Sequence, residues 1–436
     1  MIIDFKIKNY RSIKDETTFS LQASGAKGKI ENVAEIIVQN GKKFRLLKTA
    51  VIYGANASGK STLIRAFWAF RQLIDRSFRN DVNEPLDLAE PFALDNETIE
   101  EPTEFTLNFI AWDKIQYIYF VSISKHEGIV EESLKYYPSK SQKVIFSRKG
   151  RNIKSLNLDI FPEKDSPKNI NPKRLFLSEL GNSGNEYWEN MRNYFVLGNV
   201  VLNNAANGAQ RGLTENAKIV FESNDKDFIE IKNKIIQLVK LSDLGIQDLE
   251  LATEKQYNTE DENDKFYSSK RSSKRFKTFH NIYKDNQING LREFDLLNQG
   301  STGTIALVGI CTEILLSLNM KTGRPIWIDE LDNSMHPYLC RFLITLFHHP
   351  LTNPYNSQLI FATHETTLLD RNNFRKDQIW ITSKDKFGKT ELYSVFDLDI
   401  DGLRDDIPFD KWYMSGKFGG LPKIKEFDFI FNREQN

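Results

Sequence analysis

Hydrophobic and polar positions alternate near the amino terminus, as in a strand with one buried face. Ile3, Phe5 and Ile7 fall on one face of residues 2–8, and charged residues fall on the other. The same alternation recurs over 105–110, and an aromatic-rich run follows over 116–124. We therefore predict a lobe of mixed sheet over residues 1–140.

The pattern changes over residues 141–290. Phe228, Ile231 and Ile235 fall at helical spacing, and the surrounding sequence is polar, with a Gly/Asn-rich stretch at 203–212. We expect a largely helical insertion here that acts as a sensor or partner-binding unit. No heptads are sustained, which excludes a long coiled-coil arm. Strand and helix signals alternate again afterwards, so we predict a second lobe, of α/β type, over 291–436.

A charged tract, almost free of apolar residues, runs over 253–277. Its basic residues are Lys270, Arg271, Lys274, Arg275 and Lys277. Such a tract is typical of a solvated hairpin or loop, and the alternative is a contact with nucleic acid.

The sequence GANASGKS occupies residues 54–61, directly after an apolar run at 49–53. Gly54 and Gly59 allow the backbone to curl so that its N–H groups face a phosphate, at the positive end of the helix that follows. Lys60 would reach the β and γ phosphates, and the Ser61 hydroxyl would bind Mg²⁺. The alternative is a glycine turn with a chance lysine. The residues expected to contact the nucleotide here are Gly54, Asn56, Ala57, Ser58, Gly59, Lys60, Ser61 and Thr62.

Two further apolar runs end in residues suited to phosphate chemistry. The run at 325–328 ends in Asp329, which would hold Mg²⁺ through its water shell, and in Glu330, which would orient the attacking water. Ordinary acids that cap a strand are the alternative. The run at 359–362 is followed by His364, which at the carboxyl end of a parallel strand can donate to the γ-phosphate. A purely structural histidine is the alternative there.

A second anion site is predicted at the start of an apolar helix over 305–318. Ser301 and Gly303 precede this helix, whose amino terminus favours a negative charge. One chain therefore carries two half-sites. We expect the Ser301 surface of one subunit to close over the nucleotide held by Lys60 of another, in a symmetric dimer with two shared ATP sites.

Composition narrows the class of protein. Lys plus Arg and Asp plus Glu each number 59, so the net charge gives no indication of nucleic-acid binding. Cys311 and Cys340 have no metal-type or paired spacing. The longest apolar stretch is interrupted by Glu313 and is too short to cross a bilayer, and the first residues do not open a signal peptide. We expect a cytoplasmic protein with no membrane association.

These motifs, taken in order, resemble the ABC-type ATPase heads of the SMC, RecF and OLD class. More closely, the chain resembles the RloA-like ATP-binding proteins of bacterial restriction and abortive-infection loci. The likeness also includes residues 9–12 (NYRS), residues 331–337 and the tail WYMSGKFGGLP at 412–422. Gly300 stands where many relatives carry an acidic residue.

The resemblance implies an α/β fold, an ABC-type P-loop ATPase head built of a mixed β lobe and an α/β lobe. It also implies that Arg11 and Ser12 lie near the phosphates, that Ser301 and Gly303 act across the dimer, and that His364 is the switch histidine. The expected reaction is ATP and water to ADP and phosphate, with Mg²⁺. The expected partners are a second copy, or a higher homo-oligomer, and a separate effector, a nuclease or toxin, in anti-phage defence by abortive infection. The alternatives are a RecF- or SMC-like DNA-repair ATPase and a nucleotide-gated scaffold with little turnover.

Overall fold

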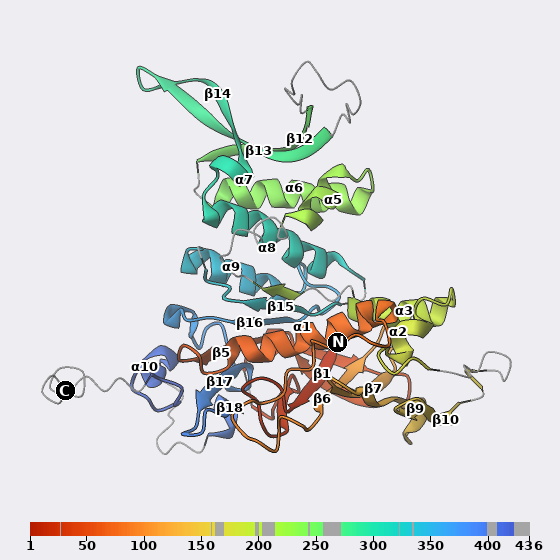
Figure 1. Ribbon diagram of the computed structural model, residues 1–436. Helices are drawn as coiled ribbons and strands as arrows, with labels where there is room; N and C mark the ends of the chain where they lie inside the picture. Colours follow the sequence, from red (N-terminus) through yellow and green to blue (C-terminus); the bar gives the residue numbers. More distant parts are fainter. Residues whose placement is uncertain are drawn as a thin grey trace, which may run out of the picture.

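Figure 1 shows the structure, a computed structural model. It describes residues 1–26, 28–157, 159–161, 170–196, 200–202, 214–242, 245–255, 272–321, 323–333, 335–398 and 408–422. Among the features noted from the sequence, the Gly/Asn-rich stretch at 203–212 and Lys270 and Arg271 of the charged tract lie outside these residues.

A seven-stranded antiparallel sheet forms the amino-terminal lobe. Its order is β10-β9-β8-β7-β6-β1-β2. The strands are β1 (Ile2–Lys8), β2 (Thr17–Ser20), β6 (Thr103–Ile110), β7 (Gln116–Ser124), β8 (Gly128–Tyr136), β9 (Lys143–Lys149) and β10 (Asn152–Leu156). Phe5 and Ile7 are fully buried, as the alternation predicts. Because β9 and β10 continue the same sheet, this lobe extends beyond residue 140, where the sequence pattern placed its end. A separate pair, β3 (Val33–Ile37) and β4 (Lys43–Leu47), shares a small core with Met1, Ile3 and Ile110.

A second sheet has six strands in the order β11-β15-β16-β5-β17-β18. Its members are β5 (Thr49–Gly54), β11 (Val200–Leu202), β15 (Ile326–Asp329), β16 (Leu359–Ala362), β17 (Ile379–Lys384) and β18 (Thr390–Ser394). All neighbours pair in parallel except β17 and β18. The carboxyl ends of β5, β15 and β16 therefore meet at one edge of the sheet, which is where ligands bind in α/β folds.

Helices separate the two sheets and cover the outer face of the second one. Helix α1 (Lys60–Arg76) lies between the two sheets, where its apolar side joins one core with residues of both (Figure 1). Helices α8 (Thr302–Asn319) and α9 (Pro337–His348) cover the opposite face and belong to a second core. Helix α8 is long and apolar enough to cross a membrane, but 78% of it is buried inside the protein, as in a core helix.

The described residues of the region 141–290 form strands as well as helices, so the prediction of a largely helical insertion is wrong for the described strands. Its helices are α2 (Phe176–Leu180), α3 (Glu186–Val196), α5 (Glu215–Glu222) and α6 (Lys226–Leu241). Strands β9 and β10 belong to the seven-stranded sheet, and β11 belongs to the six-stranded sheet. A third sheet projects beyond α5 and α6 (Figure 1) and consists of β12 (Ile246–Lys255), β13 (Ser272–Lys284) and β14 (Gln287–Asp295). The helical prediction succeeds for α6, which buries Ile231 and Ile235.

The described part of the charged tract lies in β12 and β13. Arg275 pairs with Asp295 and Lys277 with Glu293, both at 3.3 Å, while Lys274 lies 3.1 Å from a carboxylate of α5. The tract is therefore a hairpin sheet whose described basic side chains face acids. Residues 256–271 between its strands are outside the described part of the chain.

The remaining described elements are short. They are α7 (Leu296–Gln299), α10 (Phe409–Met414) and the 3₁₀ turns η1 (Ile30–Asn32), η2 (Ser77–Arg79), η4 (Thr366–Leu368), η5 (Lys376–Gln378) and η6 (Val395–Asp397).

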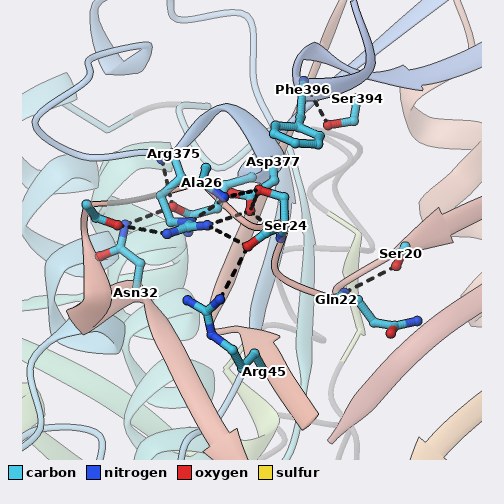
Figure 2. Close-up of polar contacts among 12 residues, drawn as sticks. Ser20, Gln22, Ser24, Ala26, Asn32, Arg45, Arg375, Asp377, Ser394 and Phe396 are labelled. Carbon is cyan, nitrogen blue, oxygen red and sulfur yellow. Dashed lines mark hydrogen bonds and ion pairs between the residues drawn. The ribbon is translucent and has the colours of Figure 1, made fainter. Parts of the chain in front are cut away.

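A buried ion pair ties a loop near the amino terminus to the carboxy-terminal lobe (Figure 2). The Arg375 guanidinium donates to both carboxylate oxygens of Asp377, at 2.9 and 2.8 Å, and to the Gly28 carbonyl at 2.7 Å. Ser24 donates to Asp377 through both its backbone N–H and its hydroxyl. Burial alone raises the pKa of Asp377, but these hydrogen bonds outweigh it and hold the pKa below its usual range. These bonds fasten the loop at residues 24–28 to the segment at 375–377, next to Gln378, which donates to the Thr49 carbonyl of β5.

Candidate functional site

The glycine-rich loop follows β5 and leads directly into α1. Gly59 caps the helix with φ of 118°, and Lys60 is its first residue. A Cβ on Gly54 would lie 2.5 Å from the Ser58 hydroxyl, and one on Gly59 would lie 2.6 Å from Thr390 Cγ2. Both positions therefore require glycine, as the sequence predicts. The loop N–H groups meet the positive end of α1 at the edge where three parallel strands end.

The Lys60 side chain folds back onto the backbone of its own glycine-rich loop. Its buried amine donates to the Gly54 carbonyl at 2.7 Å and to the Ala55 carbonyl at 3.1 Å. Burial lowers the pKa of Lys60 to about 8, although the nearby Asp329 and Glu330 favour the charged form. An incoming phosphate would give this amine stronger partners than two carbonyl oxygens.

Asp329 lies at the end of β15 behind the loop. Its carboxylate accepts a hydrogen bond from Ser61, and burial nevertheless raises its pKa. Its Oδ1 is buried and has no hydrogen-bond partner among the described residues. A carboxylate oxygen without a hydrogen-bond partner, next to a serine hydroxyl, suits a hard cation such as Mg²⁺. This cation prefers oxygen ligands and retains several waters. No group of three or more His, Cys, Asp or Glu side chains within the described ranges could hold a metal ion by itself.

Glu330 leaves the strand in a left-handed conformation, with φ of 56°. This unusual turn directs the chain away from β15, and the half-buried Glu330 reaches the same cavity as Lys60. Burial raises the pKa of Glu330, and the neighbouring charges of Asp329 and Asp332 raise it further. A carboxyl with a raised pKa is a better proton acceptor near neutral pH than an ordinary glutamate.

His364 follows β16 and is exposed. Its backbone N–H lies 3.4 Å from an Asp332 carboxylate oxygen. Burial and the positive charge of Lys60 lower the pKa of His364. The ring is therefore predominantly neutral at physiological pH and can donate one hydrogen bond to an anion.

Arg11 and Ser12 lie in a tight turn against the loop. The Ser12 hydroxyl lies 3.1 Å from Thr62 Oγ1 and accepts from Thr390 at 2.8 Å. The Arg11 Nε donates to Glu90 at 2.7 Å, and the Arg11 backbone N–H donates to the Glu90 carbonyl at the same distance. The turn is thus locked between α1 and the segment that contains Glu90.

Most of the predicted residues meet around one cavity of about 640 Å³, which we call the Lys60 cavity. Its lining includes Arg11, Ser12, Asn56, Ala57, Gly59, Lys60, Ser61, Thr62, Glu330 and His364. Gly54, Ser58 and Asp329 are buried and are not part of the lining. Sequence reasoning missed Glu90 and Lys384, which also line it, and Thr382 and Thr390, which support the loop from β17 and β18.

Ser301 and Gly303 are not part of that lining. Ser301 is exposed and caps α8, where its hydroxyl accepts from the Thr304 N–H at 3.1 Å. Gly303 lies in the first turn of the same helix and is half-buried. The structure thus brings the loop, Glu330 and His364 together and leaves the serine turn on the surface of the same chain.

The comparisons with known proteins give a family match and solved structures of low sequence identity. The model of the family described as "AAA domain, putative AbiEii toxin, Type IV TA system" matches residues 50–370, which is more than half of the chain. No curated protein matches. Among solved structures, the SMC head domain from Thermotoga maritima has a TM-score of 0.37 and 12% identity, covering 92% of this chain and 99% of that one. The recombination mediator protein RecF with ATP has a TM-score of 0.36 and 13% identity, covering 90% of this chain and 97% of that one.

The family match shows an AAA domain, and the parallel sheet around β5 confirms the expected α/β fold class.

Proposed function

Because the chain belongs to this AAA-domain family, we propose that it binds ATP in the Lys60 cavity and hydrolyses it to ADP and phosphate. The observation that carries the proposal is that Lys60 and Glu330 line one cavity, with a buried amine for the phosphates and a carboxyl of raised pKa for the water. Phosphoryl transfer depends mainly on positioning and charge stabilisation, and both are available from these residues.

Each residue has a defined task in the proposed reaction. The loop N–H groups and Lys60 bind the β and γ phosphates, and Ser61 and Asp329 would hold Mg²⁺, which neutralises phosphate charge when bound. Glu330 accepts a proton from the water as its oxygen bonds to the γ-phosphorus and the bond to the ADP oxygen breaks. The neutral His364 donates to a γ-phosphate oxygen.

We further propose that two copies share each nucleotide. Ser301 is exposed at the amino end of α8, away from the Lys60 cavity of its own chain, so a second copy can present it to the nucleotide. ATP would then hold the dimer together, and hydrolysis would release it.

The biological role that we propose is control of a separate effector in anti-phage defence, in the cytoplasm. The family description, which names a toxin of a type IV toxin–antitoxin system, supports this role. The β12–β14 sheet projects from the body and could report the nucleotide state to that effector (Figure 1). A DNA-repair role has less support, because the described basic residues of the charged tract are paired with acids.

Steady-state phosphate release with and without Mg²⁺ tests the proposal. The wild-type protein should release phosphate only with Mg²⁺, and Lys60→Ala should abolish both ATP binding and turnover. A wild-type rate no higher than that of Lys60→Ala, with ATP still bound, would instead identify a nucleotide-gated scaffold.

A further inference from the structure

The tail motif WYMSGKFGGLP at 412–422 lies outside the residues that the family model matches and has no task in the proposed reaction. In the structure it forms the end of α10 and a turn. Trp412, Tyr413 and Phe418 are buried in the core that also contains Tyr53 and α8. We call residues 412–421 the carboxy-terminal turn. It packs beside the end of β5, where the phosphate-binding loop begins.

Tyr413 contacts the first residue of that loop. Its hydroxyl accepts a hydrogen bond from the Gly54 backbone N–H and in turn lies 3.4 Å from the Gly420 carbonyl, to which it donates. Its ring packs on the Tyr53 ring, with centroids 5.5 Å apart. The hydroxyl therefore connects the loop to the turn, and the two rings hold it in register.

The turn is shaped to come this close. Gly420 has φ of 71°, and a Cβ there would lie 2.6 Å from Ile381 Cγ2 and 3.5 Å from Gly54 Cα. Only glycine fits both the conformation and the space. A second tyrosine, Tyr393 on β18, donates to the Phe418 carbonyl at 2.9 Å and anchors the turn from its other side.

Gly54 is thereby held from two directions. Lys60 binds its carbonyl and Tyr413 binds its N–H. When Lys60 moves its hydrogen bond to a phosphate, the carbonyl contact is lost and the Tyr413 contact remains. The loop then keeps the conformation in which its N–H groups face the ligand, and less conformational entropy is lost on binding.

We propose that the carboxy-terminal turn positions the phosphate-binding loop, with Tyr413 as a positioning residue for nucleotide binding. This inference rests on the proposed function, since it assigns a residue to the same site.

Equilibrium titration of the full chain with ATP and Mg²⁺ tests it through Tyr413→Phe, which removes one oxygen and keeps the ring. The matched control is Tyr283→Phe, because Tyr283 is 65% exposed on the β13–β14 hairpin. A net hydrogen bond of ordinary strength corresponds to a Kd for ATP raised about 2- to 12-fold in Tyr413→Phe. Tyr283→Phe should match the wild type. Gly420→Ala should also raise the Kd.

Thermal unfolding of the ATP-free proteins separates positioning from mere support of the fold. A Tyr413→Phe protein with a lowered Tm and an unchanged Kd would overturn the inference while leaving the proposed function intact. Wild-type protein that binds ATP no better than Lys60→Ala would overturn both.

Discussion

The affinity for ATP should fall as the pH rises above about 8, because burial lowers the pKa of Lys60 to about 8. The phosphates bind the charged amine, so above this pKa the free protein must take up a proton before it can bind. The apparent Kd is then proportional to 1 + 10^(pH − pKa). Between about pH 7 and about pH 9 this factor grows about tenfold.

Calorimetric titration with ATP and Mg²⁺ in two buffers of different ionisation enthalpy measures the same effect directly as proton uptake. Binding should take up about 0.1 proton at about pH 7 and about 0.9 proton at about pH 9. Lys60→Ala should take up no proton when it binds ATP, even at the higher ATP concentration that its residual binding requires. A wild-type Kd that stays constant over this range, or a proton uptake that persists without Lys60, would refute the reasoning.

The remaining predictions concern other positions. Glu330→Gln should bind ATP and accumulate as an ATP-dependent dimer, because binding survives while water activation fails; light scattering after size exclusion tests this, and an oligomer indifferent to ATP would contradict it. Ser301→Arg should retain ATP binding and fail to form the ATP-dependent dimer in the same light-scattering measurement. An ATP-dependent dimer that persists in this variant would exclude a shared site. Gly54→Ala should abolish ATP binding because its Cβ would overlap the Ser58 hydroxyl, while Gly25→Ala, with nothing within 4 Å, should bind normally in the same titration. Burial lowers the pKa of His348 to about 3, so below about pH 6.5 the unfolded chain binds a proton that the native one does not, and stability is lost as the pH falls towards 3 by up to about 1.4 kcal/mol per pH unit. Urea denaturation should show a shallower acid slope for His348→Gln, and an unchanged slope would count against this burial effect.

The glycine-rich loop was predictable because its sequence pattern is local. Residues 54–61 contain both the glycines and the lysine, and the apolar run before them sets the strand that positions them. Asp329 and Glu330 were predictable for a similar reason, since a short apolar strand ends at Asp329 and Glu330 follows it directly. Sequence alone could not place these groups in one cavity, because their meeting depends on the order in which β15, β16 and β5 pair.

The supporting residues were not predictable, because they come close only through that pairing. Thr382 is on β17 and Thr390 on β18, far along the chain from the loop that they support. Glu90 lies between Pro85 and Pro91 in a segment that forms neither a helix nor a strand, and hydrogen bonds from Arg11 and Tyr10 bring it to the cavity. No spacing rule marks such residues before the fold is known.

The third strand of the projecting sheet, β14, was missed for a different reason. Periodicity reports one buried face, and β14 is exposed over most of its length, so its polar and apolar residues need not alternate. The sheet is specified instead by its turn at Asp285 and Asn286, both in the left-handed conformation that a tight hairpin uses. Helix α6 buries one side and was found.

The burial of α8 bears directly on the shared-site proposal. Ser301 caps this helix, and Ile305, Ile310 and Ile314 along it are at most 2% exposed. Moving the helix so that Ser301 covers the Lys60 cavity of its own chain would expose such side chains, at a cost of about 1.5–3 kcal/mol each. A second copy can bring its own Ser301 to the cavity as a rigid body, with no such loss. If the serine turn acts on the nucleotide at all, the packing of α8 therefore favours an action across two chains over one within a single chain.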